Sequence, residues 1–220
     1  MNWKGYAWER RTGPGGPTFN GQWLAANVRE PDQDGVVIAV TNPTGSSPCA
    51  AEFHSQRAGW GYGTFRTVIG TRLDRMHPSV VFGGMFLYDA TTPPSHGEVD
   101  AGEVSAWDLA GDPAALSHTY WYDDHGVNTP VSSRTAATPD AVQTHSVTWT
   151  PGRLAFRAYS GEGTGGTLIM ESIWTSDIPT PNRERVHFNL WVFNRNDGNG
   201  DVATPVDVLL KDFSFTPHET

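Results

Sequence analysis

The sequence predicts an all-β fold built from two packed sheets. The chain of 220 residues contains nine Trp and 24 Gly, a mixture typical of many short strands joined by turns around aromatic side chains. Runs of β-branched and aromatic residues recur with partial alternation of period two, whereas no window of a dozen residues sustains a helical apolar period. A two-sheet β-sandwich fits these observations, because one sheet face can pack the core while the other bends into a groove.

Five segments carry the strand prediction in chain order. Each is short, rich in β-branched or aromatic residues, and separated from the next by turn-forming residues. Asp34-Gly35 signals a turn before the first segment, and Pro151-Gly152 predicts a hairpin between the third and the fourth. The predicted strands are residues 36–40, 63–70, 146–150, 154–159 and 186–192.

Composition bounds the number of domains and the classes of partner. With 37% hydrophobic and 18% charged residues and no visible linker or repeat, residues 1–220 are expected to form a single domain. A net charge of -9 opposes binding to nucleic acid or to anionic membranes, and it disfavours strongly sulfated substrates. Cys49 is the only cysteine, so an intrachain disulfide and a multi-thiolate metal site are excluded, and a buried thiol is expected.

Three carboxylates stand close together at Glu98, Asp100 and Glu103. In an extended strand the first two share a face, but Glu103 would point to the opposite side. A β-bulge at Ala101-Gly102 would restore it, because Gly tolerates the left-handed conformation that many bulges require. The two glutamates would then have Cα atoms about 13 Å apart at roughly 3.3 Å per residue, and their carboxyl groups could approach to about 5 Å, as in retaining glycosidases. A solvated acidic strand is the alternative that spacing alone leaves open.

The six residues from Glu98 to Glu103 resemble the bulged Glu-x-Asp-x-x-Glu signature of family 16 glycoside hydrolases, a β-jelly-roll group that includes laminarinases, lichenases and agarases. Several spaced landmarks in the right order are more specific than one hexapeptide. The resemblance covers nearly the whole chain and implies a concanavalin A-like jelly roll with a concave substrate cleft. The other landmarks are Asn27-Val28 and residues 49–55, 62–66, 144–151, 189–191 and 211–215.

The resemblance also implies roles for the three carboxylates. Glu98 would be the nucleophile, Glu103 the general acid/base and Asp100 the partner between them. Such roles need one ionised and one protonated carboxyl, and mutual repulsion in a cluster of three raises at least one proton affinity. The identity of the residue that holds the proton rests on the resemblance.

Five further residues are predicted to contact sugar because they match family positions. Amide and carboxylate groups can hydrogen-bond hydroxyls, and Trp rings can stack on sugar CH surfaces, although packing roles remain the alternative for each. These candidates are Asn27, Glu52, Trp121, Asn189 and Trp191.

Three positions depart from the family pattern and leave the substrate class open. Trp121 stands where relatives acting on β-1,3-glucan often carry His, and Phe86 stands where many carry Trp. His54 replaces an Arg found in lichenase-like relatives. β-1,3-Glucan or mixed-linkage β-glucan is the expected substrate, and β-galactan is the alternative.

No cofactor is expected for catalysis. The eight His residues lack any tight ligand spacing along the chain, so a catalytic zinc is not predicted and each His is expected to be a surface or packing residue. Asp212 resembles the aspartate that holds a structural calcium on the convex side of many relatives, so it is the candidate metal ligand.

The sequence therefore predicts an endo-acting retaining hydrolase of β-linked polysaccharide. Two alternatives stay open: a lectin-like carbohydrate-binding protein on the same sandwich, and a transglycosylase that uses the same covalent intermediate. The expected partner is a polysaccharide or oligosaccharide, with no nucleic acid or membrane, and a monomer is expected. Residues 1–20 lack the pattern of a secretion signal. A secreted or extracellular location is nevertheless expected, with Met1 a native start or one placed before a mature fragment.

Overall fold

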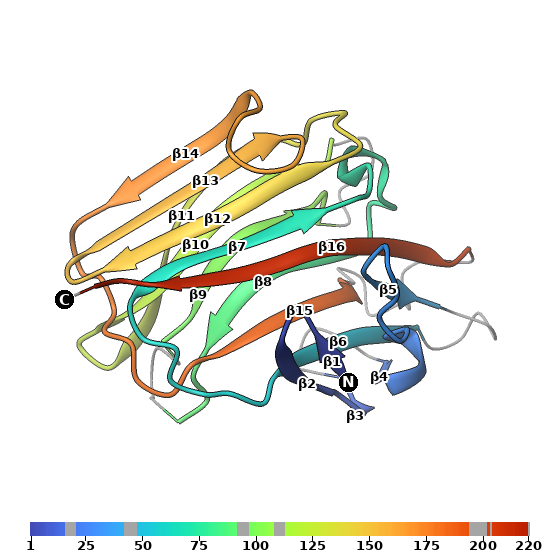
Figure 1. Cartoon of the computed structure of the whole chain (residues 1–220), viewed down its shortest axis with the longest axis horizontal. Coiled ribbons are helices and arrows are strands. Elements are labelled where there is room, and N and C mark those ends of the chain that lie inside the picture. The colour runs from blue at the N-terminus through green and yellow to red at the C-terminus, as the bar shows by residue number, and fades with distance from the viewer. Residues whose placement is uncertain are drawn as a thin grey trace.

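The computed structural model describes residues 1–15, 21–41, 48–91, 97–107, 113–193, 202 and 204–219. Within these residues the chain forms two sheets that lie face to face (Figure 1). All strand pairs are antiparallel except β4 with β6. The predicted all-β, two-sheet sandwich is therefore confirmed.

The larger sheet, here called the site sheet, has ten strands in the described residues. Eight of them form a continuous order, and the short strands β3 and β4 attach beside β6. In order across the sheet these eight are β1 (Asn2–Trp3), β2 (Tyr6–Arg10), β6 (Cys49–Ser55), β15 (Arg185–Val192), β8 (Val80–Tyr88), β9 (Val99–Ser105), β10 (Ala115–Asp124) and β11 (Val127–Ala136). The attached strands are β3 (Gly13–Pro14) and β4 (Gln22–Trp23).

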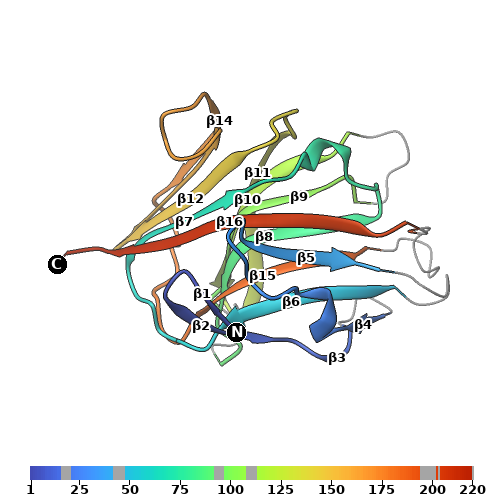
Figure 2. The same cartoon turned by 45° about the vertical axis from the view of Figure 1, so that its right-hand side comes forward.

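The smaller sheet, here called the back sheet, has six strands in the same part of the chain. Its layer stays distinct from the site sheet when the molecule is turned (Figure 2). All five strand predictions are confirmed, four of them here and the fifth as β15. Across the back sheet the order is β14 (Leu168–Trp174), β13 (Arg153–Ser160), β12 (Gln143–Thr150), β7 (Gly63–Ile69), β16 (Val206–Pro217) and β5 (Val36–Val40).

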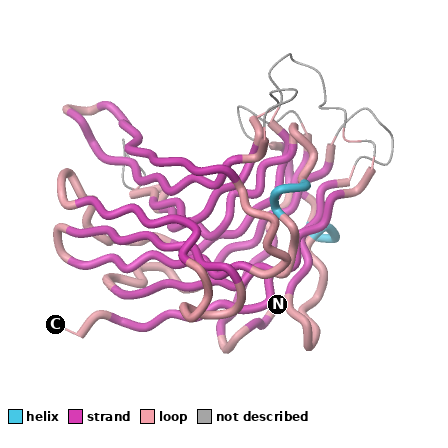
Figure 3. The backbone as a smooth tube through the Cα atoms, turned by 90° about the horizontal axis from the view of Figure 1, so that it is seen from above, coloured by secondary structure: helices cyan, strands magenta, loops and turns pink. Residues whose placement is uncertain are grey.

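Helical structure is limited to two 3-10 turns among the described residues, η1 (Ala25–Asn27) and η2 (Leu73–Arg75). Figure 3 shows strands along most of the traced backbone. No described helix has the length and apolar character needed to cross a membrane.

Aromatic packing between the sheets fixes which side chains face outward. Phe53 of β6 and Phe188 of β15 are paired in register, with stacked rings 5.1 Å apart, and both are fully buried. Trp8 and Phe213 pack around Phe53 and Phe188, with ring centroids 5.2 to 6.0 Å apart. Since side chains alternate along a strand, the neighbours of Phe53 and Phe188 point to the opposite, open face of the site sheet.

A β-bulge turns the acidic segment toward the same open face. Glu103 pairs with Ser117 of β10 and Ala101 pairs with His118, so Gly102 is left without a partner on β10. Gly102 has φ +94°, a conformation that L residues rarely adopt, and a Cβ on it would collide with the His145 ring of the back sheet. The bulge predicted at Ala101-Gly102 is confirmed, and Gly is required there by both conformation and space.

Candidate active site

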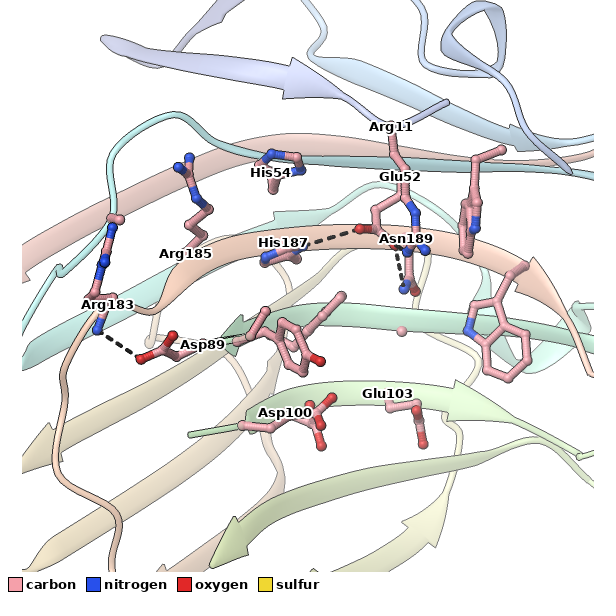
Figure 4. Close-up of a pocket in the computed structure, with 18 of the residues that line it drawn as sticks. Arg11, Glu52, His54, Asp89, Asp100, Glu103, Arg183, Arg185, His187 and Asn189 are labelled. Atoms are coloured by element: carbon pink, nitrogen blue, oxygen red, sulfur yellow. Dashed lines mark hydrogen bonds and ion pairs between the residues drawn. The ribbon is translucent and has the colours of Figure 1, made fainter. Parts of the chain in front are cut away.

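A pocket of about 630 Å³ opens on the outer face of the site sheet. Its walls come mainly from β6, β15, β8 and β9, so that segments far apart in sequence face one another across it (Figure 4). Six of the sequence-predicted site residues line it together: Glu52, Glu98, Asp100, Glu103, Asn189 and Trp191.

The three carboxylates form one wall of the pocket. Glu98 directly precedes β9, while Asp100 and Glu103 lie within it. Asp100 pairs with Thr119 and Glu103 with Ser117, whereas the Glu98 carbonyl accepts a hydrogen bond from the Trp121 amide at 3.0 Å. Residues 117, 119 and 121 are two apart along β10 and therefore share one face of the sheet. Because the bulge aligns the three acids with these residues, all three acids lie on one face.

Burial dominates the electrostatics of the two glutamates. It raises the pKa of Glu103 to about 7, with a further rise from the charge of Glu98 and an opposing effect from Arg134. Burial likewise raises the pKa of Glu98 to about 7, and the charge of Glu52 adds to the rise. Near neutral pH one of the two glutamates can therefore be ionised while the other holds a proton, which is the state that acid-assisted displacement requires.

A hydrogen bond from Asp100 makes the surroundings of Glu98 differ from those of Glu103. Burial, followed by the charges of Glu98 and Glu103, raises the Asp100 pKa well above its usual range. Its hydrogen bond to Glu98 lowers the pKa of Glu98 against the effect of burial. The Trp121 Nε1 donates to Asp100 Oδ2 at 3.3 Å. Glu98 thus has a donor that favours its anion, whereas the pKa of Glu103 is set by burial, the charge of Glu98 and the opposing charge of Arg134.

The opposite wall centres on Glu52, which is buried at 4% exposure. Arg11 Nη1 lies 2.9 Å from its Oε2, and His187 Nδ1 lies 3.2 Å from its Oε1. The amide of Asn189 donates to Oε2 at 3.5 Å. Burial alone would raise the pKa of Glu52, but His187 and Arg11 together bring it below its usual value. Glu52 is therefore an anion held by cationic and polar neighbours.

Aromatic rings supply the apolar surface of the pocket. Trp23, Phe86 and Trp191 line it, and Arg11 lies over the Trp23 ring at 4.5 Å from the centroid. Trp121 contacts Asp100, as described above, but is not among the lining residues. The structure therefore places Trp121 against the acidic wall, where it orients a carboxyl group.

Asn27 does not reach the pocket. Its side-chain amide donates to the Cys49 carbonyl at 2.8 Å and to Thr41 Oγ1 at 3.1 Å, at 7% exposure. These bonds join η1 to the Thr41–Cys49 bridge, and Asn27 is not among the residues that line the pocket. Cys49 is half-buried, which corrects the expectation of a buried thiol.

Asp212 also lies away from the pocket-lining residues, on β16 of the back sheet. Lys4 Nζ lies 3.0 Å from its Oδ1, and both side chains are substantially exposed. A calcium ion at Asp212 would therefore compete with an ammonium group already paired to the carboxylate. Calcium binding stays a prediction.

Sequence reasoning missed most of the nitrogen-bearing side chains around the pocket. His187 could have been found from strand alternation, because it lies two residues before Asn189 and so shares its face. Arg11 and Arg185 gave no comparable signal. Arg185 reaches the pocket while its guanidinium donates to the Ser55 and Gln56 carbonyls at 2.7 and 2.8 Å, an arrangement that only the folded chain reveals.

Neither a family model nor a curated protein matches this sequence. Solved structures do match its fold. A Bacillus licheniformis β-glucanase is 21% identical with a TM-score of 0.73, and the match covers 99% of this chain and 95% of that one. A prokaryotic β-1,3-1,4-glucanase (lichenase) derived from a mouse hindgut metagenome is also 21% identical, with a TM-score of 0.69 over 99% and 96% of the two chains.

A family 16 endo-glucanase from Bacteroides ovatus, whose structure is a complex with G4G3G-2F-DNP, is 11% identical with a TM-score of 0.72 over 98% and 97% of the two chains. At these identities the similarity establishes the fold. The expected jelly-roll sandwich is confirmed over nearly the whole chain.

Proposed function

We propose that this protein is an endo-acting glycoside hydrolase that cleaves β-linked glucan with retention of configuration. The observation that carries the proposal is the acidic wall, where a bulge places Glu98, Asp100 and Glu103 on one face of a pocket. The pKa of both glutamates is raised to about 7. Three carboxyls with unequal hydrogen bonding supply a nucleophile, its partner and an acid.

In the first step, Glu98 as the carboxylate attacks the anomeric carbon and forms a glycosyl ester. The bond from that carbon to the leaving oxygen breaks, and Glu103 transfers its proton to this oxygen. Protonated Asp100 donates to Glu98 and so favours the ionised nucleophile. Glu103 keeps its proton near pH 7 because burial and the charge of Glu98 both raise its pKa.

In the second step, ionised Glu103 takes a proton from water, and the water oxygen attacks the anomeric carbon. The ester bond to Glu98 breaks, and this residue leaves as a carboxylate. Two inversions at one carbon restore the β-configuration. The aromatic and polar groups of the opposite wall would hold the sugar chain across the strands.

The substrate proposal is β-1,3-glucan or mixed-linkage β-glucan. The pocket offers Trp191 and Trp23 for stacking on sugar rings and offers Asn189 and Glu52 for hydroxyl groups. Similar folds belong to proteins described as a β-1,3-1,4-glucanase and an endo-glucanase, which supports β-glucan over β-galactan. Because such polymers lie outside cells, we also propose an extracellular site of action.

A product screen with stereochemical detection tests this proposal. The protein is incubated with laminarin, lichenan, agarose, β-galactan and xyloglucan, while reducing ends and oligosaccharide lengths are measured. Laminarin or lichenan should yield a series of oligosaccharides, and proton NMR of early products should show the β-anomer first.

Other outcomes would overturn defined parts of the proposal. An initial α-anomer would refute retention. Products longer than the substrate would identify a transglycosylase, whereas binding to a glycan without new reducing ends would identify a lectin-like protein.

A further inference from the structure

We propose that Glu52, His54 and His187 form a binding site for a divalent metal ion of the zinc class. These residues lie on the wall opposite the three carboxylates, and all of them line the pocket. The inference concerns metal binding itself and does not depend on the proposed hydrolysis.

Strand register brings the three side chains together. On β6, Glu52 and His54 are two residues apart and therefore share a face. On β15, His187 pairs directly with His54 in the antiparallel register. One nitrogen from each histidine and one oxygen of Glu52 all lie within 4.8 Å of one another (Figure 4). No ligand spacing along the sequence shows this arrangement, because two strands far apart in the chain supply it.

The contact between Glu52 and His187 has the spacing of two ligands on one metal ion. Zinc binds histidine nitrogen and carboxylate oxygen at about 2.0–2.2 Å, so adjacent tetrahedral ligands are about 3.3 Å apart. Glu52 Oε1 and His187 Nδ1 are 3.2 Å apart. The His54 nitrogen lies within 4.8 Å of the other two ligand atoms, so the His54 ring would turn toward the same ion when the metal binds. Two imidazoles and a carboxylate with an open fourth position suit zinc and related ions better than calcium or magnesium.

No hydrogen bond within the described residues fixes the His54 ring. Its Nδ1 is buried without a hydrogen-bond partner in the described structure, and its Nε2 lies 3.8 Å from Glu9 Oε2, beyond hydrogen-bond range. The ring stacks on that of His187 with centroids 5.0 Å apart. A metal ion would give His54 Nδ1 a partner that none of the described residues provides.

Glu52 is oriented by groups outside the proposed ligand set. Arg11 and Asn189 both donate to its Oε2, at 2.9 and 3.5 Å. This leaves Oε1 directed toward His187. Such hydrogen bonds to the second oxygen are the kind that orient a carboxylate for metal binding.

Metal binding has a direct consequence for the pocket. An ion held by Glu52 and the two histidines would occupy the surface proposed above for sugar hydroxyls, so metal and glycan should compete. This consequence rests on the proposed function. Metal binding can be measured whether or not the protein hydrolyses glycans.

Calorimetric titration of the whole protein with zinc chloride tests the site. We expect saturable binding of one ion per chain, with affinity reduced about tenfold or more in both His54→Gln and His187→Gln. The matched control is His125→Gln, since His125 is fully exposed beside Asp124 and should not contribute. His54→Gln is the variant more certain to keep the fold, because the His54 side chain is 20% exposed and makes no hydrogen bond to any described residue.

The results separate the metal site from the catalytic proposal. Absence of saturable zinc binding, or wild-type affinity in His54→Gln and His187→Gln with unchanged melting temperatures, would overturn the site. If hydrolysis is detected, zinc should raise KM without lowering kcat in wild type and in His125→Gln, and the effect should be lost in His54→Gln. If hydrolysis is not detected, the calorimetry still decides whether the site exists.

Discussion

The two walls of the pocket bury carboxylates of the same chemical type, yet they shift proton affinity in opposite directions. Burial is the largest effect on both Glu52 and Glu103, and in each case it raises the pKa. The pKa of Glu52 ends below its usual value because His187 and Arg11 pair with the carboxylate, whereas burial, reinforced by the charge of Glu98, raises the pKa of Glu103 to about 7. The charges beside each carboxylate therefore decide whether burial is offset or reinforced. The acidic wall is suited to proton transfer because the charge of Glu98 reinforces the effect of burial on Glu103, and Arg134 offsets it only in part.

The largest expected effect comes from Glu98→Gln. This change keeps the shape of the acidic wall and removes the attacking charge, so kcat should fall by about 10³-fold or more while glycan binding survives. Steady-state kinetics and binding of a non-hydrolysed oligosaccharide measure the two effects. Full activity in this variant would refute the assigned nucleophile.

Loss of the acid in Glu103→Gln should be nearly as severe on natural glycans, at about 10²- to 10⁴-fold. Glycosides with good leaving groups need little protonation, so their first step should be spared and azide should rescue breakdown of the glycosyl-enzyme. Kinetics on activated and natural substrates compare the two cases. Equal losses on both would contradict the role of Glu103 as acid.

The Glu103→Gln variant also tests how the raised pKa of Glu103 affects the stability of the fold. The raised pKa of Glu103 means that its ionisation disfavours the folded state as pH rises from about 4.5 through 7. Gln cannot ionise, so Glu103→Gln should melt higher than wild type at pH 8, and the difference should shrink at pH 4. Thermal unfolding at the two pH values measures this.

Two substitutions of Asp100 test the contribution of its hydrogen bond to Glu98. Asp100→Ala removes the donor to Glu98, and a hydrogen bond to a charged group contributes about 1.5–3 kcal/mol, which corresponds to roughly 10- to 100-fold in rate. Asp100→Asn retains an N–H donor and should lose less. Comparison of kcat/KM for the two variants checks the order, and equal losses would argue against the hydrogen bond as the cause.

A change to the opposite wall should act on the pH profile more than on the maximal rate. The charge of Glu52 raises the pKa of Glu98, so Glu52→Gln should lower that pKa and move the acidic limb of kcat/KM to lower pH. Glu171→Gln is a suitable control, because Glu171 pairs with Arg157 in the back sheet. An unmoved acidic limb in Glu52→Gln would show that the two walls are not electrostatically coupled.

The smallest effect is expected at Asp212, a carboxylate outside the pocket. As an exposed ion pair with Lys4, it should contribute within about 1 kcal/mol to stability. If it also holds calcium, chelator should lower the melting temperature of wild type but not of Asp212→Asn. Identical melting curves with chelator and with added calcium would argue against calcium binding at Asp212 and leave the ion pair with Lys4 as its role.

Local chemistry in the sequence was sufficient for the fold class and for the bulge that puts the three acids on one face, whereas their catalytic roles rested on the family resemblance. Strand alternation, turn residues and the spacing of Glu98, Asp100 and Glu103 act over a few residues, and Gly102 allowed the bulge to be predicted from its conformational freedom. Glu52, Asn189 and Trp191 were found only through the family resemblance. Their common place in the pocket follows from register between β6 and β15, which no local pattern encodes.

Tertiary structure alone decided the electrostatic character of the site. The proton affinity of a carboxyl depends on its burial and on charges brought from distant segments, as with Arg11 beside Glu52. The same long-range packing directs the Asn27 amide to the Cys49 carbonyl, pairs Lys4 with Asp212 and brings His54 to His187. The sequence by itself determined which groups could perform chemistry, because conformational preference is local. The folded chain determined which of these groups meet, because strand register and packing join segments that are far apart in the sequence.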